Sequence, residues 1–294
     1  MNAYLASVLE SVKTKHGNEP EFVQTVEEVL SSLSPVIDRH PEYEKADLLT
    51  RMVDGVVMCS QAFEKCSEET ERIKRAYGGI LPLAAGARVA VIGDFAETPR
   101  YQGAGSSAVN SIKVDTLLDC LAQSGLQCAG FAAGFDRQGR PDADKKAQAV
   151  ALAQKADTVL LCLGLDEIKE SEGLDRVDMK LADNQIELLQ AVEQANPNTV
   201  VVLNAGASLE TLWLAHCRAL VYGALGGQAG AGAMVDVLTG KVNPGGKLAE
   251  TWANAYEETP AKDNFAGAGR TVQYREGLYV GYRYYQTAGV PVAF

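Results

Sequence analysis

From residue 88 to residue 240, short apolar runs alternate with longer stretches in which apolar residues recur at helical spacing. The runs are continuous and rich in Val, Leu and Cys, which is typical of strands buried on both faces. We expect strands at residues 88–92, 127–132, 158–163, 199–203 and 219–222. The intervening patterns predict helices at residues 114–123, 143–155, 183–194 and 230–238. This alternation predicts an α/β fold in which a mostly parallel sheet is flanked by helices, an α/β sandwich.

The first part of the chain has a different pattern. Its apolar residues recur at helical spacing, at Leu5, Val8, Leu9 and Val12 and again at Phe22, Val26, Val29, Leu30 and Leu33. Pro35 and Pro41 are expected to interrupt the helices. Short amphipathic helices of this kind need a partner surface. We therefore divide the chain into a short helical segment at residues 1–53, a junction at 54–76 and the α/β domain at 77–294.

Beyond residue 240 the alternation of strands and helices ends. Proline- and glycine-rich connections follow, and aromatic residues predict short strands, the last of them at residues 278–285. The tyrosines there are Tyr279, Tyr282, Tyr284 and Tyr285. They would stack on a sugar if they were exposed, but half-buried strands show the same pattern. Packing is the simpler interpretation.

Composition narrows the range of partners. The chain has 47% apolar and 22% charged residues, and its formal net charge of −11 repels phosphate backbones and anionic lipid. Nucleic acid and membranes are therefore not expected as partners.

The 6 cysteines form no C-x-x-C pair and the 3 histidines are far apart, so neither a zinc site nor a disulfide framework is predicted. The N-terminus has no apolar leader, and a cytoplasmic protein is the default expectation.

The loop after the first predicted strand, residues 93–107, is a candidate ligand-binding segment. It is longer than the roughly 2 to 6 residues usual for such a connection, and doubly wound sheets bind ligands at the carboxyl ends of their strands. Its glycines lack dinucleotide-binding spacing and the chain contains no P-loop, so no cofactor is expected. A packed surface loop is the alternative. The polar residues that would contact or support a ligand are Arg100, Tyr101, Gln102, Ser106 and Ser107.

The loop after the third predicted strand is acidic. It contains Asp166, Glu167, Glu170, Glu172, Asp175 and Asp178, with Lys169 and Arg176 among them. A partly desolvated carboxyl group beside like charges has a raised pKa, which is the property that a general acid requires near neutral pH. The alternative is a solvated acidic loop. The residues by themselves favour that alternative.

Several short motifs occur in a fixed order along residues 79–285. They are GILPL at 79–83, VAVIG at 89–93, TPRYQGAGSS at 98–107, ESEGLDR at 170–176, GGQ at 226–228, NPGGKL at 243–248 and YREGLYVGYRYY at 274–285. In this order they resemble the C-terminal α/β-sandwich domain of glycoside hydrolase family 3, over residues 77–294. The resemblance implies hydrolysis of β-linked glucosides or related sugars with retention of configuration, by two carboxylates with opposite tasks.

The resemblance also implies roles for individual residues. Glu172, before Gly173, matches the family's catalytic acid/base, and Glu170 is the fallback for that role. Asp175 and Arg176 match the family's D-R pair and would orient the loop through a charge-assisted hydrogen bond. The nucleophilic Asp of such enzymes lies in a TIM-type barrel, and residues 1–75 contain no S-D-W segment of the nucleophile type.

We therefore expect this chain to be part of a retaining β-glucosidase-type glycoside hydrolase, with a barrel domain supplied by another chain. The alternative is a non-catalytic carbohydrate-binding or oligomerisation module. Residues 1–53 are similar to the N-terminal helical segment of hexameric glutamate dehydrogenases, in the runs at 18–33, 40–43 and 48–53. No catalytic lysine or phosphate-binding glycine of that family maps onto the chain. The segment is interpreted as a fused helical fragment that would form homo-oligomers through its apolar stripes.

Overall fold

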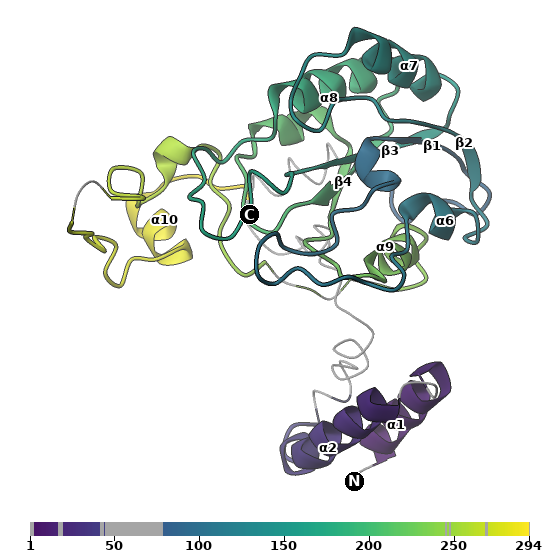
Figure 1. The fold of residues 1–294 in the computed structure, drawn as a ribbon, viewed down its shortest axis with the longest axis vertical. Coiled ribbons are helices and arrows are strands. Elements are labelled where there is room, and N and C mark those ends of the chain that lie inside the picture. Colours follow the sequence, from purple (N-terminus) through teal and green to yellow (C-terminus); the bar gives the residue numbers. More distant parts are fainter. Residues whose placement is uncertain are drawn as a thin grey trace. The chain divides into compact units, whose positions relative to one another are not determined.

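The computed structural model describes residues 3–16, 20–41, 44, 79–244, 246, 248–267 and 270–293 (Figure 1). The chain divides into two compact units, Met1–Val56 and Val57–Phe294, and each is described by itself. The expected junction at residues 54–76 lies outside the described residues, as does the start of the α/β domain at residues 77 and 78. The expected domain boundaries therefore stay predictions.

In the first unit, the described residues include two helices, α1 (Ala3–His16) and α2 (Pro20–Ile37). Its core joins Leu5, Val8 and Leu9 of α1 to Leu30 and Ile37 of α2. The helices expected from the apolar spacing are confirmed, but Pro35 lies inside α2, which continues to Ile37. Because the two apolar stripes bury each other, the main reason to expect oligomerisation through this segment is removed.

The second unit is built on a five-stranded parallel sheet in the order β2-β1-β3-β4-β5. The strands are β1 (Arg88–Ile92), β2 (Gln127–Ala132), β3 (Thr158–Gly164), β4 (Thr199–Asn204) and β5 (Ala219–Tyr222). All five are at the positions expected from the apolar runs. Every residue of β3 is buried, because this central strand has neighbours on both edges and helices over both faces.

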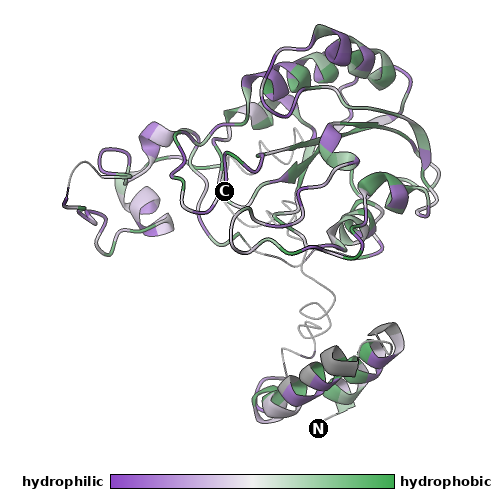
Figure 2. Cartoon of the chain, in the orientation of Figure 1, coloured by the Kyte–Doolittle hydropathy of each residue, from purple (hydrophilic) through white to green (hydrophobic). Residues whose placement is uncertain are grey.

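Helices cover both faces of the sheet. Figure 1 shows α7 (Ala143–Ala153) and α8 (Asp183–Ala195) on one face, and α6 (Leu117–Leu121) and α9 (Gly230–Leu238) on the other. Both α7 and α8 mix hydrophobic and hydrophilic positions, as helices with one buried side do (Figure 2). Short 3₁₀ turns occur at Asp94–Ala96, Leu212–His216 and Tyr256–Glu258. None of the helices in the described residues is long and apolar enough to cross a bilayer.

The helix α6 is shorter than the expected 114–123, because Thr116 is its N-cap. The Thr116 backbone is extended, and its hydroxyl oxygen accepts a hydrogen bond from the Asp119 N–H at 3.1 Å. A cap of this kind satisfies a donor at the start of the helix and fixes where the helix begins. Val114 and Asp115 therefore belong to the preceding loop.

The expected strand at residues 278–285 is wrong: Tyr282–Ala288 form the helix α10. Gly281 precedes the helix with φ of 57°, a left-handed conformation that ends any extended run. Tyr285 is buried and its ring meets the Tyr284 ring edge-on at 5.2 Å, whereas Tyr279 and Tyr282 are exposed. Of the tyrosines in this region, Tyr285 is therefore the one that packs into the domain.

The strand order decides where a ligand site can form. From β1 the chain moves to β2 on one side of it, and β3 then pairs with β1 on the other side. The order of the strands reverses between β1 and β3, and such a switch point is where parallel sheets bind ligands beyond the carboxyl ends of the strands. The loops that follow β1 and β3 are the two loops that the sequence singled out.

Candidate active site

The loops after β1 and β3 are in direct contact. Ala104 and Ser171 form a parallel bridge, and the Glu172 N–H donates to the Ala104 carbonyl oxygen at 3.1 Å. Gly105, with φ of +111°, allows this approach, because a Cβ at that position would lie 2.5 Å from the Glu172 Cβ. The loop at residues 93–107 therefore shapes the place where Glu172 lies. We call the loop at residues 165–182 the acidic loop.

Glu172 is an exposed carboxylate held by one close donor. Its Oε2 accepts a hydrogen bond from the Ser106 main-chain N–H at 2.5 Å. Hydrogen bonding from the Ser106 side chain, and then from its main-chain N–H, holds the pKa of Glu172 below its usual range. The expectation that crowding by like charges would raise this pKa is wrong for the chain by itself. A low pKa keeps Glu172 ionised near neutral pH, so a general acid here needs something to cover and desolvate it.

The Gly105→Ala variant is expected to release Glu172 from Ser106. The added methyl would collide with Glu172, and alanine is strained at a positive φ, at a cost of roughly 1–3 kcal/mol. We expect the pKa of Glu172 to rise toward that of an ordinary glutamate, measured by ¹³C NMR of labelled carboxyl groups. Gly173→Ala is the matched control, because a Cβ on Gly173 meets nothing within 4 Å although its φ is also positive. An equal rise of the pKa in both variants would contradict the steric explanation.

Glu170 has a different environment from Glu172. Its carboxylate is ion-paired with the Arg100 guanidinium, and its oxygens accept hydrogen bonds from the Gly206 N–H at 2.9 and 3.1 Å. The Glu170 side chain is only 9% exposed and that of Arg100 only 1%. A carboxylate with its lone pairs occupied by buried donors is poorly placed to transfer protons to a substrate. The geometry therefore favours Glu172 over the fallback Glu170.

Asp175 and Arg176 have different surroundings, and the charge-assisted hydrogen bond that holds the loop comes from Arg176. Arg176 Nη1 donates to the Ser208 carbonyl oxygen at 2.9 Å, and the Glu250 carboxylate accepts from the Ser208 N–H at 3.1 Å. Burial lowers the pKa of the Arg176 guanidinium, against the opposing charges of nearby carboxylates. Asp175 is exposed, and no hydrogen bond found among the described residues involves its carboxylate. Arg176 thus ties the acidic loop to the segment after β4 without help from Asp175.

The remaining candidate residues of the 93–107 loop mostly shape that loop. The Gln102 amide donates to the Val109 carbonyl at 3.0 Å and accepts from the Val109 N–H at 2.9 Å, which closes the loop. The Tyr101 carbonyl accepts from the Gly227 N–H at 2.9 Å. Ser107 is exposed beside Ser106. Of the five candidates in this loop, Arg100 and Ser106 are the two that the hydrogen bonds described above join to the acidic loop.

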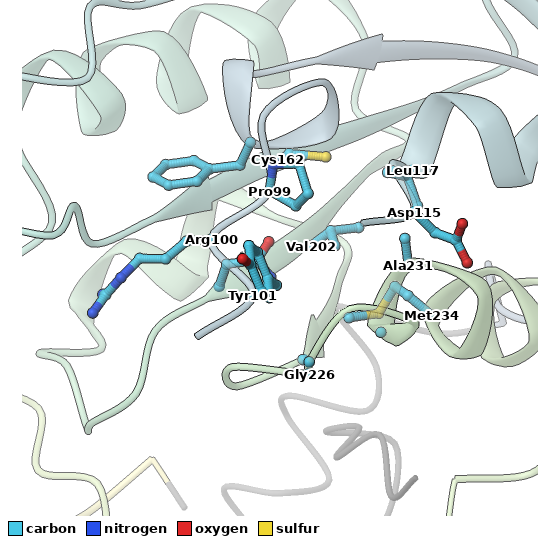
Figure 3. Close-up of a pocket in the computed structure, with 15 residues that line it drawn as sticks. Pro99, Arg100, Tyr101, Asp115, Leu117, Cys162, Val202, Gly226, Ala231 and Met234 are labelled. Carbon is cyan, nitrogen blue, oxygen red and sulfur yellow. The ribbon is translucent and has the colours of Figure 1, made fainter. Parts of the chain in front are cut away.

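A small cavity lies next to this site and does not suit a sugar. Its volume is about 40 Å³, and residues that line it include Tyr101, Cys162 and Met234 (Figure 3). Ligand pockets usually enclose about 300–1,000 Å³. Burial raises the pKa of the Cys162 thiol, which makes it unreactive. Within the described residues, no group of three His, Cys, Asp or Glu side chains is placed to hold a metal ion. This cavity is therefore too small to enclose a sugar ring.

Residues of the segment after β4 were missed from the sequence. Gly206 holds Glu170, and Ser208 joins Arg176 to Glu250. Gly206 and Ser208 follow β4, the neighbour of β3, so they lie at the same edge of the sheet as the acidic loop. Knowledge of the strand order would have identified them. The sequence contains no local signal for Glu250, which comes from the irregular segment after α9.

Comparison with known proteins identifies the family. The model of the glycosyl hydrolase family 3 C-terminal domain matches residues 74–282. An exo-alpha-(1->6)-L-arabinopyranosidase of Bifidobacterium breve is 42% identical over 224 residues, which is 72% of this chain and 30% of that protein. The thermostable beta-glucosidase B of Acetivibrio thermocellus is 33% identical over 98% of this chain and 37% of its own length. The crystal structure of the Bifidobacterium adolescentis GH3 beta-glucosidase matches with a TM-score of 0.69 and 34% identity, over 99% of this chain and 42% of that one.

These matches also bear on the length and the N-terminal segment of the chain. The chain spans 30–42% of the length of these three relatives. Two of the alignments cover 98% and 99% of the chain, and both are with beta-glucosidases. They give no support to the resemblance between residues 1–53 and glutamate dehydrogenases, which stays a prediction. A family model that matches residues 74–282, together with a crystal structure of the same family at 34% identity, decides the assignment. The chain belongs to glycoside hydrolase family 3, as a C-terminal α/β-sandwich domain.

Proposed function

We propose that this chain supplies the general acid/base of a retaining β-glycoside hydrolase, and that Glu172 is that residue. One observation carries the proposal: the Glu172 carboxylate lies exposed at the switch point of the sheet, held by a main-chain N–H from the neighbouring loop. A fixed and solvent-facing carboxylate at this place can reach a ligand bound over the carboxyl ends of the strands.

The chemistry assigns two successive tasks to Glu172. As an acid it would protonate the leaving-group oxygen while a nucleophilic carboxylate attacks the sugar, and as a base it would then activate the water that releases the sugar. In retaining enzymes the two carboxyl groups are about 5–5.5 Å apart. We propose that the nucleophile comes from a barrel domain on another chain. Burial of Glu172 under that domain would raise its pKa from the low value in this chain, because burial disfavours the charged form. The negative charge of the nearby second carboxylate would raise it further.

Exposed apolar side chains support a covering partner. On the acidic loop, Ile168, Leu174 and Val177 are 70%, 62% and 95% exposed. Val109 and Ile112, from the segment after β1, are also fully or largely exposed. Exposed apolar side chains on the loops that hold and flank Glu172 are of the kind that another protein part covers. The loops that hold and flank Glu172 therefore resemble a surface that another protein domain covers.

Reconstitution tests the proposal. The purified chain would be mixed with the part of the Bifidobacterium adolescentis beta-glucosidase that this chain does not cover, and cleavage of aryl β-glucosides would be followed. We expect turnover with both components and none with either by itself. Sedimentation checks that the complex forms, and Leu174→Lys with Val177→Lys should weaken it, whereas Val242→Lys, a position that is 46% exposed after the end of α9, should not. A complex that forms and cleaves nothing would contradict the proposal.

Three further features stay outside this test. The relatives are named for different sugars, beta-glucosides and L-arabinopyranosides, so we propose a β-glucoside or a related sugar as the substrate class. A cytoplasmic location remains a prediction from the sequence. Homo-oligomerisation through residues 1–53 also remains one, although the apolar stripes of α1 and α2 are buried on each other.

A further inference from the structure

The Arg100 side chain connects the two loops of the site. Arg100 belongs to the 93–107 loop, and its Nη1 donates to the carbonyl oxygen of Leu165, the first residue of the acidic loop, at 3.1 Å. Its Nη2 donates to the Glu170 carbonyl oxygen at 3.0 Å, and Nη1 pairs with the Glu170 carboxylate. Figure 3 shows the side chain directed away from Asp115 and Ala231 of the small cavity. One guanidinium thus holds the acidic loop at two points.

Burial makes this contact rigid. Arg100 is 2% exposed, so water does not compete for its donors. The guanidinium is planar and always charged, and it presents its donors in a fixed geometry that a lysine cannot reproduce. In surroundings of low dielectric constant the pairing with Glu170 is stronger than it would be in water. The two side chains therefore restrain each other more tightly than a surface ion pair does.

Glu170 extends the restraint to a third segment. Its carboxylate accepts from the Gly206 N–H, which follows β4. A Cβ on Gly206 would lie 3.4 Å from the Glu170 Oε2, so the carboxylate is close against this backbone. Arg100, Glu170 and Gly206 together join the segments that follow β1, β3 and β4.

We propose that Arg100 and Glu170 form a buried clamp that positions the Glu172 carboxylate against the Ser106 N–H. Glu172 follows Glu170 by two residues, with Ser171 bridged to Ala104 between them. Ser106 lies on the same loop as Arg100. The clamp therefore sets both the carboxylate and its donor, and Arg100 and Glu170 are positioning residues. This inference rests on the proposed function of Glu172 for its catalytic meaning, but its geometry can be tested without catalysis.

A titration of the full chain tests the clamp. The pKa of Glu172 is measured by ¹³C NMR of labelled glutamate carboxyl groups, with Glu172→Gln to assign the signal. In the double variant Arg100→Met with Glu170→Met, no unpaired charge stays buried, but the clamp is gone. We expect the pKa of Glu172 to rise toward that of an ordinary glutamate, and the Ser106 amide proton to exchange faster. A folded double variant that keeps the wild-type pKa of Glu172 would overturn the proposal.

Controls separate positioning from general damage. Arg218→Met removes another arginine, which donates to Asn198 at the opposite end of the sheet, and should leave the pKa of Glu172 unchanged. If the double variant does not fold, Glu170→Gln replaces it: the amide oxygen still accepts from Gly206, and only the pairing with Arg100 is weakened. A smaller rise of the pKa is then expected, and an unchanged value overturns the clamp. Failure of the proposed function has a different signature, namely turnover of the reconstituted enzyme that does not depend on Glu172.

Discussion

Glu172→Gln is expected to lower the turnover of a phenyl β-glucoside by the reconstituted enzyme about 100- to 10,000-fold, which is the usual contribution of a general acid/base. Glutamine keeps the volume of the side chain and accepts the Ser106 hydrogen bond, but it donates no proton to the leaving oxygen. A dinitrophenyl glucoside has a leaving group that needs little protonation, so its first chemical step should change much less. The measurement is kcat/KM for both substrates.

Glu170→Gln is the matched control for this experiment, because it makes the same chemical change two residues away. We expect it to affect both glucosides to a similar and smaller extent, since Glu170 is buried against Arg100 and Gly206. If Glu172→Gln slowed the two substrates equally, Glu172 would not be the proton donor. If Glu170→Gln gave the leaving-group dependence instead, the fallback assignment would be correct.

Arg100→Met is expected to destabilise the α/β domain by about 3–5 kcal/mol, because it leaves the Glu170 carboxylate buried without its partner. Both tryptophans of the chain, Trp213 and Trp252, are buried in this domain, so urea unfolding followed by their fluorescence reports on it and not on the helical segment. The midpoint of the transition should fall with little change in its slope.

Two variants check the physical reason for this loss. Arg140→Met removes an arginine whose ion pair with Asp136 is exposed to solvent, and should have a far smaller effect, because water screens that pair. Arg100→Met combined with Glu170→Met should regain much of the stability, since apolar side chains can replace a buried ion pair at little net cost. A double variant as unstable as the single one would show that packing, not an unpaired charge, causes the loss.

The local sequence was sufficient to predict most strands and helices of the α/β domain. Five apolar runs became the five strands. Burial explains this for β1, β3, β4 and β5, whose apolar residues are buried, whereas β2 is an edge strand that is mostly exposed or half-buried. The helices α8 and α9 began where their apolar spacing began. The order of the motifs was sufficient to identify the family, and the match of the family model over residues 74–282 confirmed it.

The predictions that were wrong depended on residues outside the local sequence pattern. The tyrosines of residues 278–285 alternate as a strand does, but Gly281 adopts a left-handed conformation and begins a helix. The apolar stripes of the N-terminal helices indicated a missing partner, yet each helix is the partner of the other. Periodicity reports which side of an element is buried, and not what buries it.

For the candidate site, the sequence singled out the two loops and the two carboxylates that compete for the proposed acid/base role. Tertiary structure alone separated Glu170 from Glu172, because their surroundings come from residues distant in the chain. Arg100 lies 70 positions before Glu170, and Ser106 lies 66 positions before Glu172. The sign of the Glu172 pKa shift follows from that donor, which no count of neighbouring acidic residues could reveal. The strand order brings these distant residues to one edge of the sheet, and their contacts there make the surroundings of the two glutamates different.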